Sequence, residues 1–265
     1  MQMSPFTRVC FWLLSFIVIC ISAGASDQVP NHLELGRTLV SSLSPENTSY
    51  RYKGWVRWKG DPFTSYSEAR TDCSGLISSL FERASCSMVP HQHLTSARSN
   101  HPKAEDYFNF ISKQEGFKRI DFIADILPGD IIAIKYNIVN LGRWSSDSGH
   151  VMMVDAVPDP LTKDTTPIIK STKQWEVAVI DSTKSPHGKA DTRYSKDGSK
   201  RNGVGRGIFR LYSSEDGKVI GYSWSTLRSS VYYDNSTRPL AIGRVLCYSA
   251  EAAVGTAASI TGFGR

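Results

Sequence analysis

Several features that would point to other protein classes are missing from this sequence. No apolar run after residue 21 is long enough to cross a bilayer, and no internal repeat is visible. There is no Gly-x-Ser-x-Gly motif for a serine nucleophile, and the glycine-rich segment 203–207 lacks the Gly-Lys-Ser/Thr ending of a phosphate-binding loop. The 265 residues are 40% apolar and 11% aromatic, which is ordinary material for one globular domain.

The N-terminus differs from the rest of the chain. Arg8 precedes an apolar run at 9–21, and Ala-Gly-Ala follows at 23–25. This pattern predicts a secretory signal peptide over residues 1–25 and a secreted or periplasmic mature protein. The formal charge of +6 fits contact with anionic cell-wall polymers, although such a charge is also common without such a partner.

Cysteine is scarce, with five residues in the chain. Cys10 and Cys20 would leave with the signal peptide, so that Cys73, Cys86 and Cys247 remain. An odd number of cysteines in an oxidising compartment allows one disulfide and one free thiol. We favour a disulfide between Cys86 and Cys247, with Cys73 free to react.

Cys73 stands at the expected start of a helix. Apolar residues recur at helical spacing over 76–81, and Thr71 and Asp72 stand ahead of them as candidate caps. The unpaired N–H groups and partial positive charge of a helix N-terminus favour a thiolate over a thiol, and the small Ser74 leaves room for a substrate. An isolated cysteine is more often a buried apolar residue, so the rest of the chain must decide between the two interpretations.

The remaining pattern predicts helices first and antiparallel strands afterwards, an α+β fold in a single domain over 26–248. The other expected helices are 33–43 and 104–113, and the expected strands are 131–136, 149–157, 175–180, 208–212 and 241–247. Loops are expected at 48–66, 158–173 and 185–207, and a flexible tail at 249–265.

His150 and Asp181 are the predicted partners of Cys73. His150 opens one expected strand and Asp181 closes the next, so their side chains can meet if the strands are antiparallel neighbours. The carboxylate would then hold the imidazole in the tautomer that a cysteine nucleophile needs. Taken singly, each residue is more often structural, and it is their joint placement that favours a catalytic triad.

Three segments, in this order, resemble the NlpC/P60 family of papain-like cysteine peptidases. They are Asp-Cys-Ser-Gly-Leu-Ile at 72–77, Leu-Pro-Gly-Asp-Ile-Ile at 127–132 and Gly-His-Val at 149–151. The similarity covers roughly 51–185. It implies N-terminal helices packed on an antiparallel sheet, and hydrolysis of amide bonds in peptidoglycan stem peptides, often at the γ-D-glutamyl to diamino acid bond, without a metal or cofactor.

The resemblance also assigns roles to single residues. It implies Cys73 as the nucleophile and His150 as the base, with Asp181 departing from the His, Asn or Gln that the family commonly has at the third position. An upstream tyrosine of the family could correspond to Tyr50 or Tyr52. The expected substrate-binding residues are Tyr52, Asp72, Ser74 and Gly149.

Other interpretations stay open. The same scaffold could bind cell-wall peptides without cleaving them, or pass the acyl group to an acceptor other than water. A metal site from Cys86, His91, His93 and His101 matches no compact zinc spacing. The basic run at 196–206 is most simply a solvated loop, with an anionic polymer as the sharper alternative. Peptidoglycan or cell-wall peptides are therefore the expected partners, and no nucleic acid is expected.

Overall fold

The computed structural model describes residues 29–86, 101–136, 147–195 and 197–247. The expected signal peptide and C-terminal tail lie outside the described residues. None of the described helices is long and apolar enough to span a membrane.

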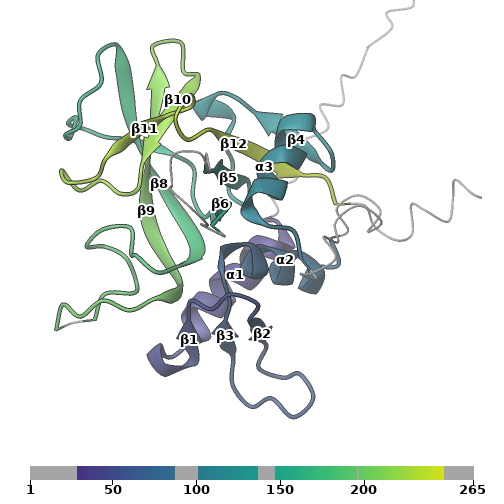
Figure 1. The fold of residues 1–265 in the computed structure, drawn as a ribbon. Helices are drawn as coiled ribbons and strands as arrows, with labels where there is room; N and C mark the ends of the chain where they lie inside the picture. The colour runs from purple at the N-terminus through teal and green to yellow at the C-terminus, as the bar shows by residue number, and fades with distance from the viewer. Residues whose placement is uncertain (1–28, 87–100, 137–146, 196, 248–265) are drawn as a thin grey trace, which may run out of the picture.

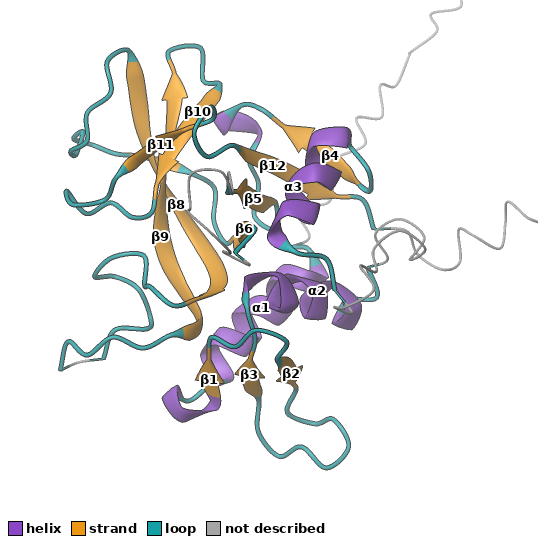
Figure 2. Ribbon diagram, in the orientation of Figure 1, coloured by secondary structure: helices purple, strands orange, loops and turns teal. Residues whose placement is uncertain are grey.

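A large antiparallel sheet of nine strands forms the body of the molecule (Figures 1 and 2). Its order is β11-β10-β9-β8-β6-β5-β12-β4, with β7 paired to β8 at the side. The strands are β4 (Phe117–Ile120), β5 (Ile131–Lys135), β6 (Gly149–Val154), β7 (Asp159–Pro160), β8 (Thr172–Thr183), β9 (Gly203–Ser214), β10 (Val219–Ser223), β11 (Tyr232–Asp234) and β12 (Leu240–Val245). The expected α+β class is confirmed.

The three described helices pack against the sheet and against one another. They are α1 (Asn31–Ser42), α2 (Cys73–Arg83) and α3 (Ala104–Lys113), and short 3-10 turns lie at Pro45–Asn47 and Ile123–Asp125. β5 and β6 are buried on both faces, which is why they read as continuous apolar runs. Ile131 and Met153 pack with the helices, whereas Ile132 and Met152 belong to a second core on the other face.

Residues 48–66, which we expected to be a loop, contribute to a second sheet. Its strands β1 (Thr48–Ser49), β2 (Trp55–Arg57) and β3 (Glu68–Arg70) lie in the order β1-β3-β2 (Figure 1). Strands of two or three residues are too short to show an alternating pattern, so they cannot be predicted from local periodicity.

The two long loops expected in the second half are also more ordered than the sequence suggests. β9 begins at Gly203, inside the expected loop 185–207, and pairs with β8 along its whole length. Residues 158–173 contain β7, and Gln174 bonds to the main chain at Thr165 and Pro167. Hydrogen bonds to distant strands therefore order segments that have no periodicity of their own.

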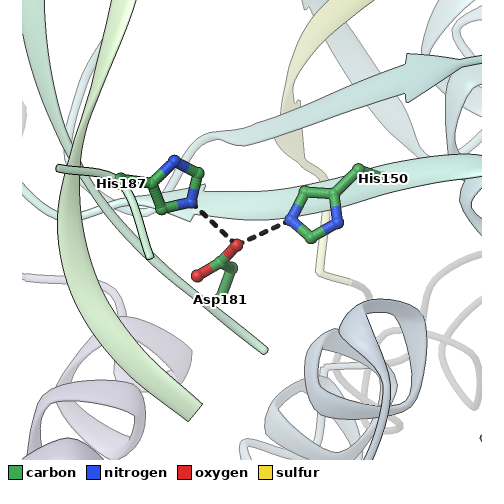
Figure 3. Close-up of side chains that lie close together, drawn as sticks. All are labelled: His150, Asp181 and His187. Carbon is green, nitrogen blue, oxygen red and sulfur yellow. Dashed lines mark hydrogen bonds and ion pairs between the residues drawn. The ribbon is translucent and has the colours of Figure 1, made fainter. Parts of the chain in front are cut away.

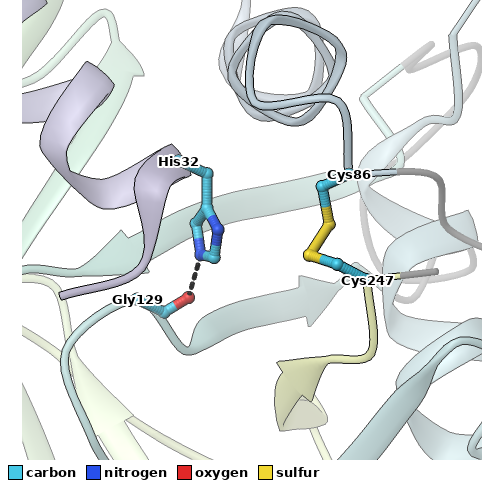
Figure 4. Close-up of a disulfide and its surroundings, with 4 residues drawn as sticks. All are labelled: His32, Cys86, Gly129 and Cys247. Carbon is cyan, nitrogen blue, oxygen red and sulfur yellow. Dashed lines mark hydrogen bonds between the residues drawn. A yellow bond between two sulfur atoms is a disulfide. The ribbon is translucent and has the colours of Figure 1, made fainter. Parts of the chain in front are cut away.

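The expected disulfide between Cys86 and Cys247 is formed, and Cys73 is free. Figure 4 shows that this bond joins the chain just after α2 to the chain just after β12. His32, at the start of α1, lies nearby and donates from Nε2 to the Gly129 carbonyl at 3.0 Å. Cys86 is thus committed to a structural role, which removes it from the metal site considered above. His91 and His93 lie outside the described residues.

Candidate active site

Cys73 is the first residue of α2, and its neighbours fix that helix start. The Gly75 N–H donates to Asp72 Oδ1 at 2.8 Å, and the Ser74 hydroxyl donates to the same oxygen at 3.2 Å. A Cβ atom at Gly75 would lie 2.4 Å from Thr71 Oγ1, so only glycine fits beneath the cap. Asp72 and Ser74 were expected as substrate-binding residues. Asp72 caps the helix, Ser74 donates to the capping carboxylate, and both line the cavity beside the thiol.

His150 and Asp181 meet across neighbouring antiparallel strands, as the sequence predicted. β6 pairs with β8 through Met153 and Ile180, and the His150 Nε2–H donates to Asp181 Oδ2 at 2.6 Å (Figure 3). Next to Asp181, the Ser182 hydroxyl donates to the Thr71 carbonyl at 2.6 Å. This bond ties the end of β8 to the residues that lead into the nucleophile helix.

The Cys73 side chain lies within hydrogen-bonding reach of His150. Because Nε2 is bonded to Asp181, Nδ1 is the ring nitrogen left for the thiol. Burial alone would lower the pKa of His150, but the negative charge on Cys73 and the hydrogen bond to Asp181 outweigh it and raise the pKa to about 10. With Cys73 as a thiolate, the imidazole is therefore protonated at neutral pH, and the two groups form an ion pair.

Asp181 has more partners than the sequence suggested. Its side chain is fully buried and also accepts from His187 Nε2 at 3.0 Å (Figure 3) and from the Arg193 guanidinium at 2.8 Å. Burial would raise the pKa of Asp181, but Arg193, His187 and His150 hold it well below its usual range. Asp181 therefore stays ionised and keeps its orientation towards His150.

His187 lies between two acceptors. Its Nε2 faces the ionised Asp181, and its Nδ1 lies 2.7 Å from the main-chain carbonyl of Trp224. Each ring nitrogen of His187 therefore lies against an oxygen that can only accept a hydrogen bond. The Trp224 ring stacks on His187 with centroids 4.2 Å apart and meets His150 edge-on at 4.9 Å.

Arg193 completes the buried charge balance. It binds Asp181 on one side and Asp191 on the other, with both Asp191 oxygens accepting, at 2.8 and 2.7 Å. Sequence reasoning missed His187 and Arg193 because they belong to the segment expected to be a mobile loop. No local pattern marks them, since their roles come from contact with β8.

His150, Asp181 and His187 could by residue type hold a metal ion. The three are already joined by direct hydrogen bonds, and Arg193 places a cation on the same carboxylate. An ion needs about 2 Å to each ligand and would have to replace these bonds while lying close to Arg193. The arrangement fits a hydrogen-bonded triad with a supporting cation better than a metal centre.

Two adjoining cavities flank the triad. One, of about 130 Å³, lies beside Cys73, and the other, of about 310 Å³, lies beside His150. The residues that line both are Tyr50, Asp147, Gly149 and Lys184. The continuous surface they form passes the reacting groups, as a groove for an extended substrate must.

Of the two candidate tyrosines, Tyr50 lines more of the groove than Tyr52. Tyr52 lines the Cys73 cavity, as expected, but it is 55% exposed. Tyr50 lines both cavities, and burial together with the negative charge of Cys73 raises its pKa. Tyr50 is therefore the more buried of the two tyrosines and lines the groove on both sides.

Gly149 also has a structural reason to be glycine. Its φ is +147°, and a Cβ atom would lie 1.9 Å from the Ile134 carbonyl oxygen. Because any side chain would push β6 away from β5, Gly149 fixes the position of His150 as well as lining the groove.

The loop expected at 158–173 and the basic run at 196–206 do not obstruct the groove. The described residues of 158–173 and of 196–206 contribute nothing to the lining of either cavity. A substrate can therefore approach Cys73 without displacing these segments.

Comparisons with known proteins give one informative result. No family model and no solved structure matches this chain. It is 37% identical over 227 residues to the uncharacterized protein R653 of Acanthamoeba polyphaga mimivirus, and the match covers 83% of this chain and 98% of the viral protein. With nearly the whole viral protein aligned at this identity, the chain belongs to the same protein family as R653 of that virus.

Proposed function

We propose that this protein is a cysteine hydrolase that cleaves amide bonds through a Cys73 thioester, with a papain-like fold of the NlpC/P60 type. The observation that carries the proposal is the relay from Asp181 to His150 Nε2 at 2.6 Å, with the other ring nitrogen left for a free thiol at a helix N-terminus. Such a group of nucleophile, base and orienting carboxylate is the arrangement that acyl transfer needs.

The first half of the reaction forms the thioester. The Cys73 thiolate attacks the amide carbon, and the carbonyl electrons move onto oxygen. The Cys73 N–H, in the first turn of α2 where the helix has no internal acceptor for it, donates to that oxyanion. His150 passes its proton to the leaving nitrogen, the carbon–nitrogen bond breaks, and the amine departs.

The second half releases the acid. Neutral His150 takes a proton from water, and the oxygen attacks the thioester carbon. The carbon–sulfur bond then breaks, so that the thiolate and the protonated imidazole are restored. Asp181 remains ionised throughout, and it orients His150 and stabilises its positive charge.

We infer that the substrates are stem peptides of peptidoglycan and that the protein meets them after export. Support for export comes from the composition of residues 1–25, and support for the substrate comes from the three motif segments. The groove adds a chemical argument, because Lys103 and Lys184 line it beside Cys73. Asp72 and Asp147 line the same cavity, so the lining carries both signs and suits a peptide with charged groups of both signs.

To test the proposal, the protein that lacks residues 1–25 is incubated with muropeptides, and the products are identified by mass spectrometry. We expect cleavage products from the natural sequence and none from Cys73→Ala, which keeps the buried volume small and removes only the sulfur. Binding of muropeptides without cleavage by either protein would instead support a non-catalytic binder. Equal cleavage by both would show that another group or a contaminant acts.

A further inference from the structure

The larger cavity lies on the side of the site where the leaving amine must be. His150 lines this cavity and Cys73 does not, whereas Cys73 and not His150 lines the smaller one. In the mechanism above, His150 delivers its proton to the leaving nitrogen. The cavity of about 310 Å³ therefore receives the part of the substrate that departs as the amine.

Arg238 lies in the wall of that cavity in a fixed position. Asp234 accepts hydrogen bonds from the main-chain N–H groups of Ser236 and Thr237 on its side chain and from the N–H of Arg238 on its carbonyl. The Arg238 guanidinium lies 4.1 Å from the ring centroid of Tyr233 and 4.8 Å from that of Tyr136. Aromatic rings hold this cation, and it forms no ion pair with any carboxylate in the described parts of the chain.

Tyr222 places a second donor in the same cavity. Its side chain is 2% exposed, and its hydroxyl faces Arg238 without a hydrogen bond of normal geometry to any described residue. Burial raises the pKa of Tyr222, so the phenol keeps its proton and can donate. A buried hydroxyl without a partner is costly, and an acceptor bound in the cavity would satisfy it.

We propose that Arg238 and Tyr222 together bind a carboxylate of the departing amine, so that the substrate residue after the cleaved bond is an amino acid with a free carboxylate. The proposal rests on the proposed function, because that function defines which cavity receives the amine. Lys184 and Asp147 line the cavity as well. Groups of both signs suit a zwitterionic amino acid better than a polyanion such as phosphate.

The experiment measures binding with the chemistry removed. In the Cys73→Ala protein, γ-D-glutamyl-meso-diaminopimelic acid is titrated against the same dipeptide with its diaminopimelate carboxyl groups converted to carboxamides. A charged hydrogen-bond pair predicts roughly tenfold tighter binding of the acid. We expect Arg238→Gln to reduce that ratio to about twofold, Tyr222→Phe to reduce it partly, and Arg238→Lys to keep most of it.

Controls separate this site from general electrostatics. Arg228→Gln removes an exposed arginine that does not line the cavity and should leave the tenfold ratio unchanged. Thermal unfolding checks that each variant is folded. The proposal would be overturned if the Cys73→Ala protein bound neither dipeptide, or bound the acid and the carboxamide equally well. It would also be overturned if the preference for the acid survived Arg238→Gln, or if inorganic phosphate bound more tightly than the acid. If the preference holds but muropeptides are not cleaved, the proposed function fails and the carboxylate site stands.

Discussion

Both ends of α2 carry a buried cysteine with a buried histidine in its neighbourhood. At the N-terminal end, Cys73 is free and lies within reach of His150. His150 is in turn bonded to Asp181 (Figure 3). Beyond the C-terminal end, Cys86 is bonded to Cys247, and the nearby His32 donates to a main-chain carbonyl (Figure 4). The same residue types form a candidate catalytic group at one end and a structural bond at the other.

The two histidines are both buried, yet their pKa values move in opposite directions. Burial dominates at His32 and lowers its pKa, since the Gly129 carbonyl and the charge of Asp130 only partly oppose it. At His150 the negative charge of Cys73 and the bond to Asp181 outweigh burial and raise the pKa to about 10. The partners of a buried histidine, rather than burial itself, decide whether it can act as a proton donor.

The largest expected effect is the loss of hydrolysis when the charge of Asp181 is removed. Asp181→Asn keeps the shape but loses the anion that orients His150 and stabilises its charge, so we expect hydrolysis to fall about 10³- to 10⁴-fold. The matched control is Asp130→Asn, which removes another buried carboxylate, one that accepts from Arg244 at 2.9 Å away from the groove. Steady-state rates of both variants, with circular dichroism to verify folding, make the test, and an Asp181→Asn rate within tenfold of the natural protein would contradict it.

Removing the disulfide should affect stability and spare the thiol. The bond spans 161 residues, and breaking it with Cys86→Ser and Cys247→Ser together should lower the free energy of unfolding by about 2–5 kcal/mol. Urea unfolding measures this loss, and alkylation of Cys73 at neutral pH serves as the second readout. Loss of Cys73 reactivity in a variant that is still folded would mean that the two ends are not independent.

The smallest effect concerns the pH dependence of stability at His32. Its pKa is lowered in the folded state, so the unfolded chain binds the proton more tightly and stability falls as the pH drops below about 6.5. His32→Gln should flatten the loss of stability between pH 7 and 5 by at most about 1.4 kcal/mol per pH unit. Its lost ring contact with Phe81 lowers stability at every pH, so the slope is the readout. An unchanged slope would refute this account of His32.

The sequence alone pointed to the three residues that meet in the candidate site, because such residues leave local marks. A capping aspartate before Cys73, a glycine before His150 and an aspartate at the end of a strand are each visible in a few residues. The helix at 104–113 was predicted with its observed bounds, since its apolar residues keep one face. The disulfide was predicted from the three cysteines that remain after residue 25, once Cys73 was set aside as the free thiol.

What could not be predicted depends on contacts between distant segments. His187 and Arg193 reach Asp181 from a stretch without periodicity, and Tyr222 and Arg238 line the groove from strands and turns far along the chain. Tyr50 was distinguished from Tyr52 only once their exposure was known. Residues that support a site or form its walls need no fixed spacing from the nucleophile, so nothing in the sequence identifies them.

The most direct test of the account is the pH dependence of iodoacetamide alkylation at Cys73, compared between the natural protein and His150→Ala. We expect rapid alkylation at pH 6 to 7 in the natural protein. In His150→Ala the rate at the same pH should fall by about tenfold or more, because the variant lacks the imidazolium that stabilises the thiolate. His32→Ala, which removes the buried histidine at the other end of α2, should behave like the natural protein. Identical profiles with and without His150, or a Cys73 that does not react at all, would contradict the assignment of an active site here.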